Sequence, residues 1–90
     1  MAQAHVDPGE LRRFARDLNR FNAEVQTLLS AMNSRMQQLE QSWQDQEQQK
    51  FAEEFSQTVK ALGRFLEASA RHTAFLNKKA RHIEEYLQQR

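Results

Sequence analysis

Hydrophobic side chains recur three or four positions apart in two separate stretches of the chain, and a polar stretch lies between them. The first stripe, with Leu29 and Met36 at its edge, consists of Leu11, Phe14, Leu18, Phe21, Val25, Leu28, Met32 and Leu39. The steps alternate between three and four, broken only at Arg35, and such spacing is typical of helices that pack together at shallow angles. The segment Asp7, Pro8, Gly9, Glu10 is a helix start signal, because it supplies a capping carboxylate and then proline at the first helical position. We therefore predict a helix over about residues 8–40.

The first stripe does not continue past Leu39. Extending its spacing reaches only polar residues or glycine, namely Ser42, Gln46, Gln49, Glu53, Ser56, Lys60, Gly63 and Glu67. A new stripe of different phase, preceded by Phe51, runs through Phe55, Val59, Leu62, Leu66, Ser69, Thr73, Leu76, Ala80, Ile83 and Leu87. A phase change inside a polar stretch indicates a reversal of chain direction, because each helix must turn its own stripe toward the other. The sequence predicts one all-α domain over 1–90, an antiparallel hairpin with helices over about 8–40 and 47–88 and a turn at 41–46.

The two stripes predict the contact between the helices. We expect the first helix to contribute Phe14, Leu18, Phe21, Val25, Leu28 and Met32, packed against Phe55, Leu62, Leu66, Leu76 and Ile83. In such a seam, Leu28→Asp would cost several kcal/mol, because it buries an unpaired charge. Gly63 is expected to mark a close approach of a helix backbone.

A lone helical hairpin has no second layer to cover its open side. The second helix carries further apolar or aromatic residues beside its stripe, and we take His72, Phe75 and Tyr86 as candidate partner contacts. We predict that two hairpins pair into a dimeric four-helix bundle. A homodimer is the simplest arrangement, and a heterodimer with a paralogous hairpin remains the alternative.

Composition and charge exclude several function classes. The 90 residues include no cysteine. The chain has 13 Lys and Arg and 12 Asp and Glu, so its net charge is +1 and it lacks the basic excess typical of nucleic-acid binding. Arg12, Arg16 and Arg20 form an i, i+4 ladder, and we expect residue 12 to lie opposite about residue 76. We interpret these cations as a solvated face, because carboxylates such as Glu84 are interleaved with them.

The sequence contains no recognisable catalytic motif. His5, His72 and His82 lack the spacing of a zinc helix, and there is no glycine-rich phosphate loop or nucleophile motif. We therefore expect a protein without enzymatic activity, cofactor, metal ion or small-molecule substrate. No apolar run approaches the roughly 20 residues of a membrane span. The segment 1–7 has neither the cationic start nor the apolar core of a Sec signal peptide, so none is expected.

One stretch resembles a known family. The segment Leu39-Glu-Gln-Ser-Trp43-Gln-Asp45, followed by Phe51 and Phe55, is similar to the tryptophan turn and Phe-x-x-x-Phe helix start of the WXG-motif family of small type VII secretion substrates, the early-secreted-antigen-like proteins. The resemblance implies a helical hairpin that pairs into a four-helix bundle and is exported without a Sec signal by an ATPase-driven machine. It also implies a role for Trp43 and Asp45 at the turn.

Two positions depart from the family pattern. Asp45 stands where the family has glycine, and we expect its carboxylate to cap the second helix. Many members end in a Tyr-x-x-x-Asp/Glu export signal, whereas Arg90 follows Tyr86 here and reverses that charge. The leading hypothesis is a type VII-like secreted hairpin that functions as a dimer, with the secretion ATPase as a further candidate partner. The alternative is an intracellular coiled-coil adaptor or scaffold that is not exported.

Overall fold

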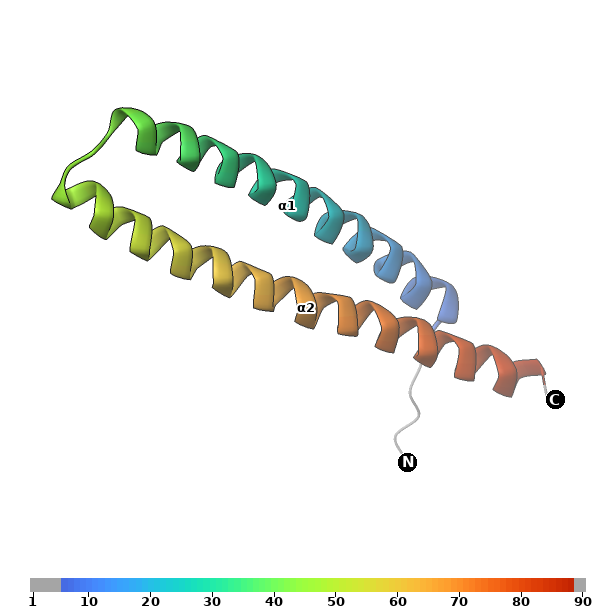
Figure 1. The fold of residues 1–90 in the computed structure, drawn as a ribbon. Helices are drawn as coiled ribbons and strands as arrows, with labels where there is room; N and C mark the ends of the chain where they lie inside the picture. The colour runs from blue at the N-terminus through green and yellow to red at the C-terminus, as the bar shows by residue number, and fades with distance from the viewer. Residues whose placement is uncertain (1–5, 89–90) are drawn as a thin grey trace.

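The protein is a hairpin of two long antiparallel helices (Figure 1). The computed structural model describes residues 6–88, in which α1 spans Pro8–Ser42 and α2 spans Gln46–Gln88. The predicted all-α hairpin is confirmed, and no strand occurs within the described residues. α1 ends two residues later than predicted and α2 begins one residue earlier, so only residues 43–45 connect them. Arg90 and His5 lie outside the described residues.

The start of α1 follows from its sequence. Asp7 is the N-cap residue, and its Oδ1 accepts a hydrogen bond of 2.9 Å from the backbone N–H of Gly9. Pro8 occupies the first helical position, where the missing N–H costs nothing because that group has no partner inside the helix. Glu10 in the first turn faces the positive end of the helix dipole.

The hairpin is a single layer. Its extents are 68 × 24 × 13 Å, and the shortest matches the thickness of one helix with its side chains. Among the described residues, only Ala15 and Ala80 are buried apolar residues, at 1% and 0% exposure, and no large side chain is fully buried. A domain normally needs two packed layers to enclose a core, and this single layer leaves large apolar side chains such as Phe14 and Leu28 exposed.

The seam between the helices differs from the predicted one on α1. Besides Pro8 and Arg12, the buried or partly buried residues of α1 are Leu11, Ala15, Leu18, Asn22, Val25, Leu29 and Met36. Phe14, Phe21, Leu28 and Met32 were expected in the seam, but they are 59%, 48%, 66% and 48% exposed. α1 is thus rotated toward Ala15 and Asn22, because its apolar arc is wider than one partner helix can cover. The small Ala15 occupies the closest approach, and the larger side chains lie at the flank.

On α2 the seam runs through the residues that the second stripe contains. Phe55, Leu62, Leu66, Leu76 and Ile83 are all partly buried, and Ser69 is only 3% exposed. The α2 residues of the predicted contact therefore lie on the side of the helix that faces α1.

Gly63 does not mark a close approach of the helices, contrary to the expectation from sequence. A Cβ built on Gly63 meets no atom within 4 Å apart from its own helix backbone and chain neighbours. The expectation was wrong because α2 faces α1 there through Leu62 and Leu66, while Gly63 lies on the flank of the seam in a groove with Leu29, Ser30 and Asn33.

Gly63→Ala is therefore expected to stabilise the protein by about 1 kcal/mol, the helix-propensity difference between alanine and glycine. This corresponds to a rise in Tm of roughly 4–8 °C for a domain of this size, measured by thermal unfolding followed by circular dichroism. Gly9→Ala is a matched control, because a Cβ there would lie 3.3 Å from Asp7 Oδ1 and crowd the cap. An unchanged or lowered Tm for Gly63→Ala would show that the space beside Gly63 is filled in solution.

Candidate interaction surface

One broad side of the hairpin carries large exposed hydrophobic residues from both helices. We call it the apolar face, and it comprises Phe14, Phe21, Leu28, Met32 and Leu39 of α1 with Phe65, His72 and Phe75 of α2. The α1 members lie on one side of the helix, since Phe14, Phe21 and Leu28 are each separated by two helical turns. The rings of Phe21 and Phe65 meet edge to face with centroids 6.4 Å apart, which joins the two helices on this side.

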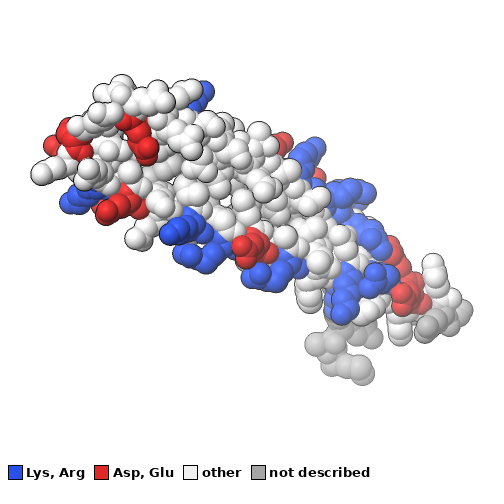
Figure 2. Space-filling model, in the orientation of Figure 1, with Lys and Arg blue, Asp and Glu red and all other residues white. Residues whose placement is uncertain are grey.

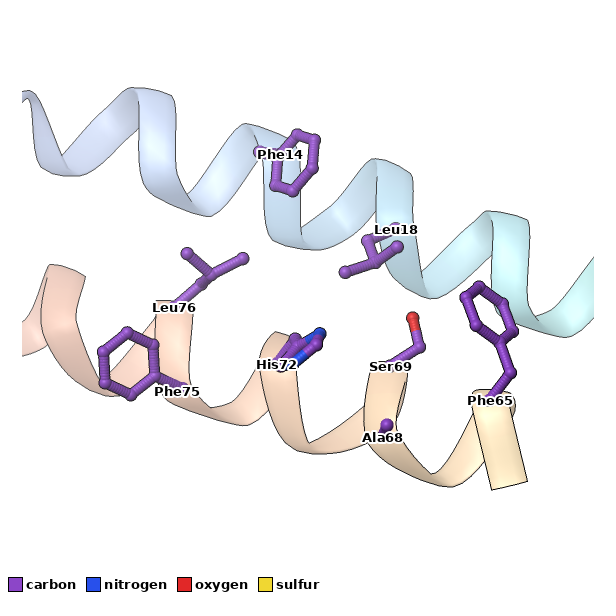
Figure 3. A pocket seen from close by; sticks show the side chains of 8 residues that line it. All are labelled: Phe14, Leu18, Phe65, Ala68, Ser69, His72, Phe75 and Leu76. Atoms are coloured by element: carbon purple, nitrogen blue, oxygen red, sulfur yellow. The ribbon is translucent and has the colours of Figure 1, made fainter. Parts of the chain in front are cut away.

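A groove opens in the apolar face toward the open end of the hairpin (Figure 3). Its volume is about 440 Å³, and it is lined by Phe14, Leu18, Phe65, Ala68, Ser69, His72, Phe75 and Leu76. Leu18 and Leu76 reach into the space between the helices, whereas Phe75 points away from α1. His72 is the only titratable residue among the lining side chains. The groove suits an apolar side chain of a binding partner.

The predicted partner contacts fall in two places. His72 and Phe75 line this groove together, and Phe75 is 64% exposed. Tyr86 is 67% exposed and lies in a separate groove near the end of α2, with Val6, Lys79, His82, Ile83 and Leu87. The structure therefore brings two of the three candidates together, and the third belongs to the last turns of α2.

The opposite side of the hairpin is polar, and we call it the polar face. The groove between the helices there is lined by Gln26, Leu29, Ser30, Asn33, Gly63, Leu66, Glu67 and Ala70. Only Leu29 and Leu66 of this set are large apolar residues, and both belong to the seam. The hairpin is therefore apolar on one broad side only.

The turn is built around Trp43 and Asp45. Trp43 is the C-cap of α1, where its backbone N–H donates to the carbonyl of Leu39 at 2.9 Å. Its indole ring lies against Phe51, with centroids 5.8 Å apart, and Phe51 stacks on Phe55 at 6.0 Å. Asp45 Oδ1 accepts a 2.8 Å hydrogen bond from the backbone N–H of Gln48, so the carboxylate caps the start of α2.

Aspartate fits at position 45 without backbone strain. Within the described residues no residue has a positive φ angle, the conformation that would favour glycine over other residues. The departure from a Trp-x-Gly turn therefore leaves the turn intact and adds a capping group.

A polar pair interrupts the apolar seam at its open half. Ser69 Oγ donates a 2.8 Å hydrogen bond to Asn22 Oδ1 across the two helices. The Nδ2 group of Asn22 is buried and finds no hydrogen-bond partner among residues 6–88. Sequence reasoning missed Asn22, although its steps of seven to Ala15 and Leu29 were a signal that it belongs to the seam.

Ser69→Ala is expected to destabilise the hairpin by about 1–3 kcal/mol, because it leaves the buried Asn22 amide without its one partner. The double variant Asn22→Leu, Ser69→Ala removes both polar groups and is expected to regain that loss or exceed it. Urea unfolding of the single and double variants measures both effects. If the double variant were less stable than Ser69→Ala, the polar pair would add more to the stability of the hairpin than the burial of its polar groups costs.

The arginine ladder is partly neutralised by ion pairs. Arg12 contacts Glu84 of α2 at 2.6 Å in a two-bonded arrangement, and Arg20 contacts Asp17 at 3.3 Å. The Arg12 side chain therefore contacts residue 84, whereas residue 12 was expected to lie opposite about residue 76. These pairs agree with the interpretation of the cations as a solvated face.

The pair of Arg12 and Glu84 makes stability depend on pH. The side-chain hydrogen bond from Arg12 lowers the pKa of Glu84 below its ordinary value. A carboxyl group whose pKa is lower in the folded than in the unfolded protein stabilises the fold at pH values above the unfolded-state pKa. This stabilisation is lost as the pH falls through the folded-state pKa. The Tm difference between the wild type and Glu84→Gln is expected to be positive at neutral pH and to vanish on acidification. Glu85→Gln, on the same helix turn, is the control, and equal pH profiles for both would contradict the pair's role.

Residues 6–88 contain neither a metal-binding cluster nor a membrane-spanning helix. No group of three or more His, Asp or Glu side chains is arranged to hold a metal ion there. Neither helix contains, in this part of the chain, a stretch long and apolar enough to cross a membrane.

Comparisons with known proteins agree with this geometry. The profile of a family described as proteins of 100 residues with WXG matches residues 3–86. The crystal structure of the secreted protein EsxB from Bacillus anthracis strain Sterne, in a glycine-to-alanine variant, is similar to this chain with a TM-score of 0.80 at 25% sequence identity. That similarity covers 93% of this chain and 97% of the EsxB chain. No curated protein matches the chain at a significant level.

Proposed function

The chain belongs to the WXG100 family, and from this premise we propose that it is a small protein exported by a type VII secretion machine, acting through dimerisation and protein–protein contacts. The resemblance seen in the Trp43 turn is confirmed by the family match over residues 3–86. The similar EsxB is described as a secreted protein. Export of this chain without a Sec signal, driven by a secretion ATPase, is the corresponding proposal here.

The observation that carries the proposal is the uncovered apolar face of a one-layer hairpin. Phe14, Leu28 and Phe75 are 59%, 66% and 64% exposed. Burying apolar surface stabilises an association by about 25 cal/mol per Å², so a face of this extent favours a second helical layer. A second hairpin supplies that layer as a four-helix bundle.

The proposal assigns the function to surfaces rather than to catalytic groups. The groove at the open end of the apolar face is lined by hydrophobic residues apart from Ser69 and His72. Such a lining suits a partner's side chains, and the Ser69 hydroxyl in it donates its hydrogen bond to Asn22 Oδ1 rather than to His72. We propose that the protein has no enzymatic activity and that Trp43 closes the turn end of the bundle.

Secretion of a tagged chain in its native host tests the proposal. We expect the protein in the culture medium of the wild-type strain and its retention in cells that lack the secretion ATPase. A cytosolic marker protein controls for lysis. Retention in both strains would contradict export and favour the intracellular adaptor. A further variant, Arg90→Glu, tests whether the charge after Tyr86 limits the amount exported.

A further inference from the structure

The basic residues of α2 are concentrated in one segment. Residues 60–82 contain six Lys and Arg and one Glu, a net charge of +5, whereas the whole chain has a net charge of only +1. Residues 40–54, around the turn, contain five acidic residues and one lysine, a net charge of −4. Figure 2 shows basic side chains along the edge of the molecule that α2 forms, from the middle of the hairpin toward the open end, and acidic ones at the turn. The balanced composition therefore conceals a strongly basic stretch of one helix.

Four of these cations form a row that we call the basic edge, namely Lys60, Arg64, Arg71 and Lys78. Each is two positions along the chain from Leu62, Ser69 or Leu76 of the seam, and two positions turn a helix by about 200°. The basic edge therefore lies on the side of α2 that is turned away from α1, and all four side chains are exposed. At 1.5 Å per residue, the row is about 27 Å long.

The basic edge is not neutralised by ion pairs, in contrast to the arginines of α1. Arg12, Arg13 and Arg20 each contact a carboxylate, at 2.6, 2.8 and 3.3 Å. No member of the basic edge forms an ion pair with another residue in the described part of the chain. Glu67 is the single acidic residue of the segment 60–82, so the row keeps a net positive charge. This charge is available to an anionic partner.

We infer that the basic edge binds the surface of an anionic lipid membrane, with α2 lying along that surface. Clusters of about four to eight Lys and Arg on one helix are typical of binding to anionic headgroups. A straight helix edge meets a flat surface along its whole length, so the four cations reach headgroup phosphates at once. The basic edge lies outside the apolar face. The inference therefore goes beyond the proposed function and depends on neither dimerisation nor export.

The surroundings of the row favour a flat lipid surface over a nucleic acid. A helix in a groove of a duplex has phosphates on both of its flanks. The flank of α2 toward the polar face carries Gly63, Glu67 and Ala70, which supply no cation. The row also contains no aromatic residue on which the bases of a single strand could stack. A flat surface requires cations on one side of the helix only, as found here.

The acidic turn determines how the hairpin lies on the membrane. An anionic surface attracts the segment 60–82 and repels the turn, whose net charge is −4. The C-terminal half of α2 therefore lies closest to the lipid headgroups, and the turn tilts away from them. α1 lies on the far side of α2 from the membrane.

Sedimentation with lipid vesicles tests the inference on the full-length chain. We expect binding to vesicles of equal parts phosphatidylglycerol and phosphatidylcholine at low salt, weaker binding at high salt, and no binding to phosphatidylcholine alone. Each Lys or Arg near an anionic surface strengthens binding about fivefold, so Arg64→Gln with Arg71→Gln is expected to weaken it about 25-fold.

Arg13→Gln with Arg20→Gln is the matched control, because it removes the same charge from exposed positions of α1. The hairpin is 24 Å wide, more than the Debye length of roughly 10 Å at 0.1 M salt, so this change is expected to alter binding less than about threefold. Equal losses for the two double variants would show that net charge alone acts, and would overturn the basic edge as the site.

A polarity-sensitive fluorophore on single cysteines tests the orientation, since the chain has no cysteine of its own. Ala74 lies three residues after Arg71 and four before Lys78, on the same side of α2, and is exposed. The Ala74→Cys label is expected to report a less polar environment when vesicles are added. Labels on Thr27→Cys, on the outer side of α1, and on Gln46→Cys, at the turn, are expected to remain in water. A response of the Thr27 label equal to that of the Ala74 label would contradict the orientation.

The remaining outcomes decide whether a membrane is the partner. An absence of binding to the anionic vesicles at low salt would overturn the inference. Binding to inorganic polyphosphate or to duplex DNA without binding to the vesicles would show that the basic edge recognises a phosphate polymer instead. The secretion test decides the proposed function independently of either result.

Discussion

Substitution of Ala80 by aspartate is expected to unfold the hairpin. Ala80 is 0% exposed and, with Ala15 at 1%, forms the tightest part of the seam among the described residues. An unpaired carboxylate there is either buried at a cost of several kcal/mol or forces the helices apart. Small domains have about 5–15 kcal/mol of stability in total, and the described part of this hairpin fully buries no large side chain. The cost therefore approaches the whole stability of the fold.

Circular dichroism at 222 nm and thermal unfolding measure this effect. Ala74→Asp is a matched control, because it makes the same change on α2 at an exposed position. The control is expected to lose only about 0.5–0.7 kcal/mol through helix propensity. A cooperative melt for Ala80→Asp close to that of Ala74→Asp would show that the helices do not approach each other at Ala80.

Leu28→Asp is expected to leave the hairpin folded and to break the dimer. The sequence predicted that this change would cost the hairpin several kcal/mol, but Leu28 is 66% exposed and lies on the apolar face. We therefore expect Leu28→Asp to weaken the association of two hairpins rather than the folding of one. Loss of two buried leucines per dimer costs about 3–6 kcal/mol, equivalent to a rise in the dissociation constant of roughly a hundredfold to ten-thousandfold.

Light scattering over a concentration series measures the mass of this variant. Ser30→Asp, on the polar face, is the control and is expected to keep the wild-type mass. Helicity is compared with that of the wild type diluted below its own dissociation constant, so that loss of the dimer is not mistaken for unfolding. An unchanged dissociation constant would show that the apolar face is not the interface. A loss of helicity beyond that of the diluted wild type would show that Leu28 packs in the seam between α1 and α2.

Local features of the sequence determined the two helices and their reversal. Asp7 and Pro8 define the start of α1 through a backbone cap that involves neighbouring residues only. The polar stretch around Trp43 separates two stripes of different phase, and this phase change is enough to predict an antiparallel hairpin. The family was recognisable from the same stretch, because the tryptophan turn is a short-range pattern.

The rotation of α1 about its own axis was decided only by tertiary structure. Two overlapping sets of positions on α1 could face α2, one through Phe14, Phe21 and Leu28 and the other through Ala15, Asn22 and Leu29. Hydropathy favours the first set, but close packing of two helix backbones favours the small Ala15, and Asn22 gains a hydrogen bond from Ser69 across the seam. The open space beside Gly63 and the reach of Arg12 to Glu84 follow from that same rotation and register. Periodicity specifies which residues share a side of a helix. Which of two neighbouring sides faces the other helix depends on side-chain volumes and on the partners that the other helix supplies, and the pattern of one stripe contains neither.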